Sequence, residues 1–229
     1  MKSKVGVVLS GCGFLDGSEI HEAVFTLLGL DELGVEAVCM APDGPQHHVV
    51  DHLAKVPVAG AVRDMRQEAA RLARGRIVDL AKVRADDLDA LVLPGGFGAA
   101  KNLCDFAAKG AAATAHPEVA RLLREMHAGK KPIGAICIAP VVVAAVLGRA
   151  VQPLLTIGDD ATTAAALVAM GARHQTCAVT ECVIDHEQHI VSTPAYMFEA
   201  RPSEIAAGVR KLCAALVGMI RTAARGGSR

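Results

Sequence analysis

Aromatic residues are scarce in this sequence, which has one Tyr, five Phe and no Trp. Proteins that stack single-stranded nucleic acid on aromatic side chains need more of them. An excess of either charge is also missing, because 24 Lys and Arg stand against 24 Asp and Glu and the formal net charge is zero. Without a net positive charge, no overall field attracts nucleic acid or an anionic membrane. We therefore expect neither of these as a partner.

Long apolar runs and closely paired cysteines are missing as well. The run Val5–Leu9 is too short for the core of a signal peptide. The stretch Ile133–Gly148 contains Pro140 and falls short of the ~20 residues of a membrane-spanning helix. The seven cysteines include no Cys-x-x-Cys pair, so nothing indicates a zinc knuckle or a dithiol redox site. We expect a cytoplasmic protein with free thiols, no bound metal and no cofactor.

Short apolar segments alternate with longer amphipathic ones along the 229 residues. The apolar segments predict strands at 5–9, 35–40, 88–93 and 133–136, and a hairpin from 178–184 and 189–192. The amphipathic segments predict helices at 18–33, 61–74, 116–127, 138–147, 161–170 and 203–222, and Gly148 is expected to end the helix at 138–147. This alternation is typical of an α/β fold in which helices cover both faces of a mostly parallel sheet. We expect one domain over residues 1–222, an irregular insertion at 47–58 and a flexible tail at 223–229.

A cysteine stands where a buried strand turns into a helix. Cys137 separates the predicted strand 133–136 from the predicted helix 138–147, and the small residues Ala135 and Ala139 flank it. Small neighbours permit the strained turn that lifts a nucleophile above a sheet. A thiol at a helix N-terminus has a lowered pKa, so we predict that Cys137 is a reactive thiolate. The alternative is a buried cysteine that packs as a small apolar residue.

A glycine-rich loop follows the predicted strand 88–93 and should lie at the same rim of the sheet as Cys137. In this loop, the backbone N–H groups of Gly95 and Gly96 are free to turn toward a ligand. We predict that these two groups and the N–H group of Ile138 form an oxyanion hole. An ordinary strand-to-helix turn is the alternative.

Two carboxylates lie near the start of the first predicted helix, for which Ser18 is a candidate N-cap. Glu19 and Glu22 are three positions apart and share a helix face. A protonated carboxyl group there can donate a hydrogen bond to the Cys137 thiolate, whereas the alternative is that both acids are solvated and favour the helix N-terminus. His21 should point elsewhere, because neighbouring residues on a helix diverge by about 100°.

Three polar residues near the rim loops are possible pocket residues: Cys12, Lys101 and Asn102. For these three, ordinary core or solvated positions are the alternative. A group of histidines, His47, His48 and His52, resembles a metal cluster. The segment that carries them is expected to be a loop, so we favour surface histidines.

Four stretches together resemble a known family: Ser10–Gly13, Asp16–Glu22, Pro94–Asn102 and Ala135–Pro140. They are similar to the PfpI-like, class I glutamine-amidotransferase-like superfamily and, more narrowly, to its isoprenoid-biosynthesis (enhancing lycopene biosynthesis) branch. The resemblance implies a flavodoxin-like three-layer sandwich, a nucleophilic Cys137 in a nucleophile elbow and Glu22 in contact with its thiol. It also implies a homodimer and a glyoxalase-type lyase that converts methylglyoxal or glyoxal into hydroxy acids without glutathione.

The sequence departs from this superfamily in its histidines. Proteases of the superfamily place His directly after the elbow cysteine, where this chain has Ile138. Amidotransferases use a downstream His-x-Glu, and no histidine after Cys137 has Glu two positions on. We therefore expect neither protease nor glutaminase activity. Two alternatives to an enzyme remain open, namely a redox sensor in which Cys137 is oxidised and an interaction protein that keeps the elbow as architecture.

Overall fold

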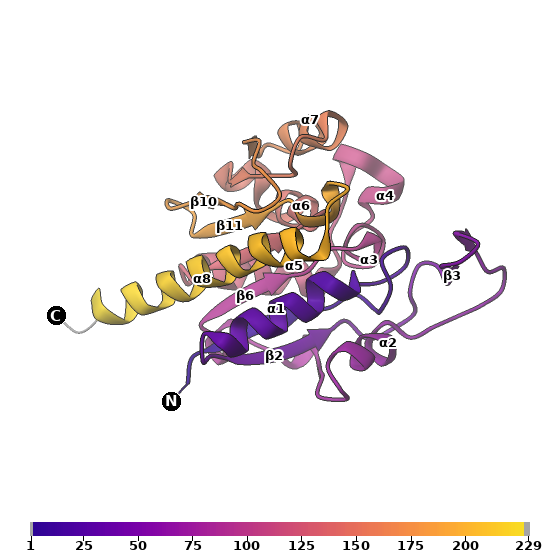
Figure 1. The fold of residues 1–229 in the computed structure, drawn as a ribbon, viewed down its shortest axis with the longest axis horizontal. Helices are drawn as coiled ribbons and strands as arrows, with labels where there is room; N and C mark the ends of the chain where they lie inside the picture. Colours follow the sequence, from indigo (N-terminus) through magenta and orange to yellow (C-terminus); the bar gives the residue numbers. More distant parts are fainter. Residues whose placement is uncertain (1, 227–229) are drawn as a thin grey trace.

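The computed structural model describes the backbone of residues 2–226 and has a seven-stranded sheet at its centre (Figure 1). The strands of this sheet are β1 (Lys4–Val8), β2 (Glu36–Ala41), β5 (Val78–Asp79), β6 (Ala90–Leu93), β7 (Ile133–Ile136), β10 (Val183–Asp185) and β11 (Ile190–Thr193). Their spatial order is β10-β11-β7-β6-β1-β2-β5. Neighbours pair in parallel, except for the antiparallel pair β10 and β11 at one edge. The predicted mostly parallel sheet is confirmed.

Helices cover both faces of this sheet. On one face, α1 (Ile20–Glu32) and α8 (Pro202–Gly226) lie side by side (Figure 1). On the other face lie α5 (Pro117–Ala128) and α6 (Pro140–Val151). The remaining helices are α2 (Met65–Leu72), α3 (Phe97–Lys101), α4 (Phe106–Lys109) and α7 (Ala161–Ala169). The result is the expected α/β sandwich of three layers.

The core is divided by the sheet into two apolar clusters. In β1, Val5 and Val7 pack into the cluster beneath α1 and α8, whereas Val8 packs into the cluster beneath α5 and α6. In β7, Ile133 and Ile136 also belong to opposite clusters. Successive side chains of a strand point to opposite faces. A strand that is buried on both faces therefore needs a continuous apolar run, as the sequence of β7 has.

The loops at the carboxyl ends of the central strands meet at one rim of the sheet, and backbone hydrogen bonds hold them together. The N–H group of Glu19 donates to the Gly95 carbonyl at 3.0 Å. At the neighbouring strand, the N–H group of Cys137 donates to the Thr193 carbonyl at 2.9 Å. Backbone hydrogen bonds alone thus join the loop at Glu19 to the loop at Gly95, and the turn at Cys137 to the end of β11.

Several predicted helix boundaries are wrong, and two of them have a clear physical reason. The N-cap of α1 is Glu19, because Ser18 turns inward and accepts a hydrogen bond from the Ser10 N–H group at 2.8 Å. Gly148 does not end α6, which continues to Val151. The backbone carbonyl of Met170 approaches Gly148 so closely that a Cβ atom would not fit. This glycine therefore serves the packing of α6 against the turn after α7 rather than the end of the helix.

The expected irregular insertion at 47–58 and the expected tail at 223–229 both contain regular structure. The segment 47–58 includes an antiparallel pair, β3 (Val50–Asp51) and β4 (Val56–Pro57). A second short pair, β8 (Leu154–Leu155) and β9 (Arg173–His174), runs parallel. Helix α8 reaches Gly226, so residues 223–226 are helical and the predicted tail begins too early. The rest of that predicted tail, 227–229, lies outside the described residues.

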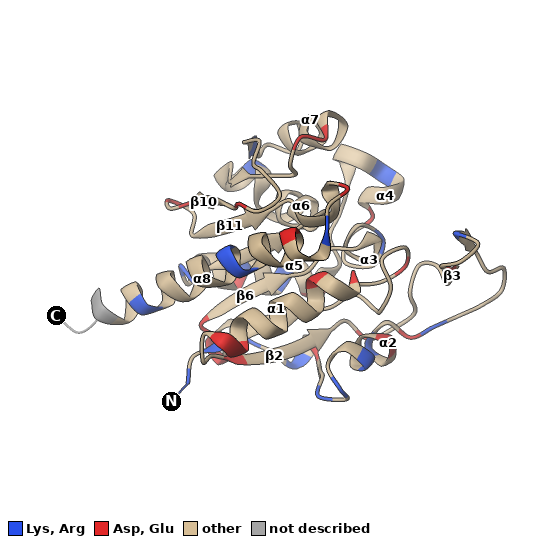
Figure 2. Ribbon diagram, viewed as in Figure 1, with Lys and Arg blue, Asp and Glu red and all other residues tan. Residues whose placement is uncertain are grey.

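Charged residues of both signs are interspersed over the ribbon, as the balanced composition suggests (Figure 2). Within residues 2–226, no helix combines the length and the apolar content needed to cross a bilayer.

Candidate active site

Cys137 occupies a strained turn directly after β7. Its φ angle is +59°, in the left-handed region that residues with a side chain rarely adopt. The turn is held from both sides, because the Cys137 N–H group donates to the Thr193 carbonyl and the Ala139 N–H group donates to the Ile136 carbonyl at 3.0 Å. Such strain costs on the order of 1 kcal/mol or more and persists where the surroundings impose it. The predicted sharp turn at Cys137 is thus present, although α6 begins only at Pro140.

Glu22 in the first turn of α1 lies fully buried against the Cys137 thiol. Its Oε2 atom accepts a hydrogen bond from the Gly95 N–H group at 2.9 Å, and its Oε1 atom accepts one from the Tyr196 N–H group at 3.3 Å. Burial, and secondly the negative charge of Glu19, raise the pKa of Glu22 to about 8. At neutral pH this carboxyl group is therefore mostly protonated and able to donate to the sulfur.

The pKa of the Cys137 thiol is raised, not lowered as the sequence predicted. Burial is the main cause, since the residue is 6% exposed, and the charge of an ionised Glu22 adds to it. The N–H groups of Gly96 and Ile138 act in the opposite direction by hydrogen bonding to the sulfur. The expected effect of a helix N-terminus is outweighed because the thiol is removed from water.

Gly95 has a different role from the one predicted. Its N–H group is engaged by Glu22 and does not point to an oxyanion hole. A Cβ atom on Gly95 would lie 2.5 Å from Cys137 Cβ and 2.6 Å from Glu22 Oε2. The missing side chain is thus the condition for the approach of the thiol to the carboxyl group. The backbone donors left at the sulfur are those of Gly96 and Ile138, and the oxyanion hole expected from these two stays a prediction.

A cavity of about 430 Å³ opens beside Cys137. Its walls are largely apolar, with four aromatic rings and a methionine: Phe14, Phe97, Phe106, Tyr196 and Met197. Glu19 also lines it, and burial raises the pKa of this carboxyl group, whose Oε2 atom accepts a hydrogen bond from the Glu22 N–H group at 2.7 Å. The cavity is of a size and polarity suited to a small molecule.

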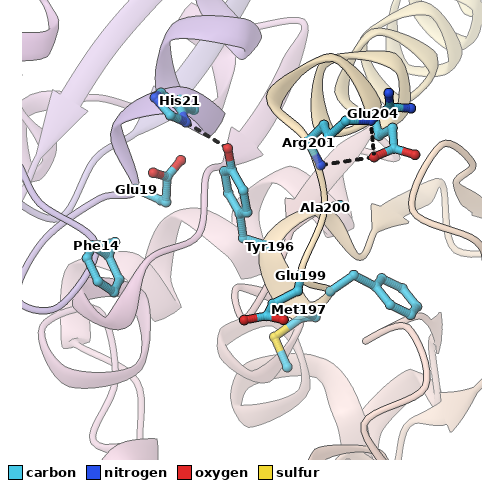
Figure 3. A pocket seen from close by; sticks show the side chains of 10 residues that line it. Phe14, Glu19, His21, Tyr196, Met197, Glu199, Ala200, Arg201 and Glu204 are labelled. Carbon is cyan, nitrogen blue, oxygen red and sulfur yellow. Dashed lines mark hydrogen bonds and ion pairs between the residues drawn. The ribbon is translucent and has the colours of Figure 1, made fainter.

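A larger cavity of about 780 Å³ adjoins the first one (Figure 3). The two cavities share four lining residues: Phe14, Glu19, Tyr196 and Met197. Cys137 lines only the smaller cavity. The smaller cavity is therefore the one in which a bound molecule would meet the Cys137 thiol, despite the greater volume of its neighbour.

Tyr196 is a site residue that the sequence reasoning missed. It follows β11, and its backbone N–H group holds Glu22 while its ring lines both cavities. Its hydroxyl group lies 2.7 Å from His21 Nδ1, so His21 points toward Tyr196 rather than toward Cys137 (Figure 3). The family resemblance described above also extends through the stretch Thr193–Met197, and this was the signal that could have identified the residue.

Three predicted pocket residues do not line the Cys137 cavity: Cys12, Lys101 and Asn102. The Asn102 amide donates to the carbonyl groups of Ser10 and Asp16, both at 2.8 Å, and so ties the first rim loop in place. Lys101 Nζ donates to the Leu15 carbonyl at 2.9 Å, and Cys12 pairs with Ser18 in an isolated β-bridge. These three residues hold the loop that carries Phe14 in its conformation. They therefore support the rim of the site from behind and do not contact a molecule in the Cys137 cavity.

Among the three histidines at 47, 48 and 52, His52 has different partners from the other two. The rings of His47 and His48 contact each other, with centroids 4.3 Å apart. His52 turns away to the first rim loop, where its Nε2 atom accepts a hydrogen bond from the Leu15 N–H group at 3.3 Å. Over the described part of the chain, no group of three or more His, Cys, Asp or Glu residues is arranged to hold a metal ion.

Comparisons with known proteins agree with this geometry. Residues 16–148 match the DJ-1/PfpI family. The chain is 44% identical over 217 residues to the mitochondrial ES1 protein homolog of Rattus norvegicus, covering 91% of this chain and 80% of that protein. It is 46% identical over 206 residues to the mitochondrial glutamine amidotransferase-like class 1 domain-containing protein 3 of Homo sapiens, covering 86% of this chain and 76% of that protein. Since both names describe mitochondrial proteins, the cytoplasmic location of this chain stays a prediction.

Solved structures show the same fold. An isoprenoid biosynthesis protein with an amidotransferase-like domain from Ehrlichia chaffeensis has a TM-score of 0.89 and 38% identity, over 94% of this chain and 98% of that chain. Drosophila melanogaster DJ-1beta has a TM-score of 0.56 and 21% identity, over 99% of this chain and 97% of that chain, which shows a shared fold.

Proposed function

Since the chain belongs to the DJ-1/PfpI family, we propose that it is a glutathione-independent, glyoxalase-type lyase that uses Cys137. Its substrates are small α-oxoaldehydes such as methylglyoxal or glyoxal, and its products are 2-hydroxy acids. The observation that carries this proposal is that Cys137, which lines a cavity of about 430 Å³, has the buried carboxyl group of Glu22 against its thiol. A thiol nucleophile beside a carboxyl group of raised pKa is the arrangement that such chemistry requires.

The first step joins the thiol to the aldehyde. The reaction starts in the fraction of molecules in which Glu22 is ionised: its carboxylate accepts the Cys137 proton, and the Sγ atom adds to the aldehyde carbon, C1. The carbonyl electrons move to the aldehyde oxygen, which takes the proton back from Glu22 and leaves a hemithioacetal. A pKa of about 8 suits a group that must both accept and donate a proton near neutral pH.

The second step moves hydrogen within the substrate. Glu22 removes the C1 hydrogen as a proton and delivers it to the neighbouring carbon, C2, while the hydroxyl proton on C1 passes to the oxygen on C2, so that C1 is oxidised and C2 is reduced. The product is a thioester on Cys137. Water then adds to C1, the C–S bond breaks, and the 2-hydroxy acid leaves with the thiol restored. The sequence balances without an external oxidant or reductant.

The redox-sensor alternative has less support from the geometry. Sensor cysteines are solvent-accessible and of low pKa, whereas Cys137 is buried and its pKa is raised. A small, uncharged aldehyde can enter an apolar cavity and reach the thiol there, so the proposed enzyme does not need a solvent-exposed Cys137. The site therefore favours an enzyme over a sensor.

Lactate formation from methylglyoxal by the purified protein tests the proposal. We expect turnover by the wild-type chain, loss of turnover in Cys137→Ala and unchanged turnover in Cys213→Ala, a second buried thiol that lines no cavity with Cys137. Wild-type protein that forms no lactate above the buffer rate, or Cys137→Ala that retains turnover, contradicts the proposal. The sensor alternative is supported instead if the protein forms no lactate and mass spectrometry shows that mild peroxide treatment oxidises Cys137.

A further inference from the structure

Tyr196 stands at the boundary between the two cavities, in contact with both the buried pair and the solvent side. Its backbone N–H group donates to Glu22 Oε1 at 3.3 Å, and its side chain lines the same cavity as Cys137. The hydroxyl group at the other end of the ring lies 2.7 Å from Nδ1 of the exposed His21 (Figure 3). The two rings have centroids 5.8 Å apart and are tilted by 42°.

The Glu22 carboxyl group alone cannot serve every proton transfer of the proposed reaction. Its two oxygens are oriented by the N–H groups of Gly95 and Tyr196, and it contacts the sulfur. From there it can serve C1, the oxygen on C1 and C2 in turn, but while it holds the C1 proton it cannot also protonate the oxygen on C2. The two substrate oxygens must also exchange protons when the double bond shifts, and the Gly95 N–H group is not free to assist them.

We propose that the Tyr196 hydroxyl group is the second acid–base group of this site and that His21 is the positioning residue that stabilises its phenolate. This inference rests on the proposed function. While Glu22 takes the proton from C1, the Tyr196 hydroxyl donates its proton to the oxygen on C2, and an enediol forms. While Glu22 returns its proton to C2, the Tyr196 phenolate removes the proton from the oxygen on C1, and the thioester forms. Each group ends in its starting state, so the step balances.

His21 is the side chain whose geometry suits this task. Burial and the negative charges of Glu19 and Glu22 raise the pKa of Tyr196, so a phenolate there needs a hydrogen-bond donor. A neutral imidazole with its proton on Nδ1 donates to the phenolate oxygen and leaves Nε2 to the solvent. The spacing in α1 explains the division of labour, because Glu22 points into the core while the adjacent His21 points along the surface to the hydroxyl group.

The test compares Tyr196→Phe with three single variants: His21→Leu, His21→Asn and His186→Leu. We expect Tyr196→Phe to lower kcat by about 10²–10³, the usual worth of an acid–base group, with KM within about twofold of wild type. Cys137 should still react with iodoacetamide at the wild-type rate. His21→Leu should lower kcat by a smaller factor, and His21→Asn should recover part of it, because an amide can still donate to the phenolate. His186 lies in the exposed hairpin tip between β10 and β11, so its variant should behave as wild type.

A second measurement does not depend on turnover. The chain has one Tyr and no Trp, so the ultraviolet absorbance of phenolate reports Tyr196 alone. We expect His21→Leu to raise the pKa of Tyr196 in this titration and His186→Leu to leave it unchanged. A Tyr196→Phe variant with wild-type kcat overturns the inference, and so does a titration that His21→Leu does not move. Wild-type protein without lactate formation instead refutes the proposed function and the catalytic role of Tyr196, and the titration then decides the role of His21 by itself.

Discussion

Cys137 and Cys213 are both buried and belong to the same apolar cluster beneath α1 and α8, yet their surroundings differ in every other respect. Cys213 lies within α8, is fully buried, and has only a long contact of 3.9 Å from its Sγ atom to the Thr26 carbonyl. Cys137 lies at positive φ beside a carboxyl group, two backbone donors and a cavity. Burial raises the pKa of both thiols. Burial therefore does not distinguish the two thiols; the backbone and the neighbours do.

Helix α1 reaches both thiols and contacts each in a different way. Its first turn presents Glu22 to Cys137, and Gly29, two turns later, faces Cys213. A Cβ atom on Gly29 would lie 3.3 Å from Cys213 Sγ, a tight contact that a shift of a few tenths of an ångström relieves, whereas a Cβ atom on Gly95 would overlap both Cys137 and Glu22. One glycine improves the packing of two helices, and the other makes a chemical contact possible.

The largest effect that separates the two regions is expected from Glu22. Glu22→Gln should lower turnover by at least about 10² because an amide cannot carry a proton. Alkylation of Cys137 by iodoacetamide should persist, since the amide still donates to the sulfur, whereas Glu22→Ala should slow both reactions. Thr26→Ser, a buried change one turn along α1 that keeps the hydroxyl on the Glu22 carbonyl, is the matched control. Full turnover of Glu22→Gln would remove this residue from the mechanism.

The pH dependence of stability is the next largest difference. The pKa of Glu22 is about 8 in the folded protein against 4.5 ordinarily, so between these values the folded chain binds a proton that the unfolded chain releases. The contribution of Glu22 to the free energy of unfolding is therefore fully present below about pH 4.5 and is lost as the pH rises through about 8. Urea denaturation over this range should show wild type losing stability relative to Glu22→Gln, by a few kcal/mol in order of magnitude. Parallel stability curves would contradict the burial of a neutral carboxyl group.

The two glycines sharpen the comparison at the level of packing. We expect Gly95→Ala to destabilise the protein by about 1–3 kcal/mol, because the added methyl group must displace Cys137 or Glu22, and to reduce turnover strongly. Gly29→Ala should change stability by less than about 1 kcal/mol, since a tight contact with Cys213 is offset by a better helix former. Thermal denaturation and lactate assays measure both. Equal losses from the two substitutions would mean that Gly95 has no special role.

The smallest expected effect is on the relative stability of glycine and alanine variants, which should have opposite order at Cys137 and at Cys213. At Cys137 the φ angle is +59°, so Cys137→Gly should be more stable than Cys137→Ala by about 1 kcal/mol. At Cys213, inside α8, glycine should be less stable than alanine by about 1 kcal/mol. Urea denaturation of the four variants checks the signs. The same sign at both positions would show that the turn at Cys137 relaxes without cost.

Sequence patterns were most informative where a property depends on neighbours along the chain. The buried strand 133–136 was predicted with its observed limits, because a continuous apolar run between turns has few other solutions. The turn after it followed from the small residues around Cys137. Gly148 misled the prediction because a glycine that ends a helix and a glycine that lets another backbone approach look the same in a sequence. The N-cap failed for a similar reason, since Ser18 had a second partner in the distant residue Ser10.

The alternation of apolar strands and amphipathic helices by itself determined the parallel sheet, the rim at its carboxyl ends and the place of Cys137 on that rim. The contact of Glu22 with the thiol was implied by the family resemblance. Only the tertiary structure decided which other groups meet there: Gly95 with the carboxyl group, and His21 with Tyr196. It also decided the direction of the Cys137 pKa. The physical reason is that desolvation and hydrogen bonding at a buried site sum over residues from four separate loops, and no spacing along the chain records how closely those loops approach.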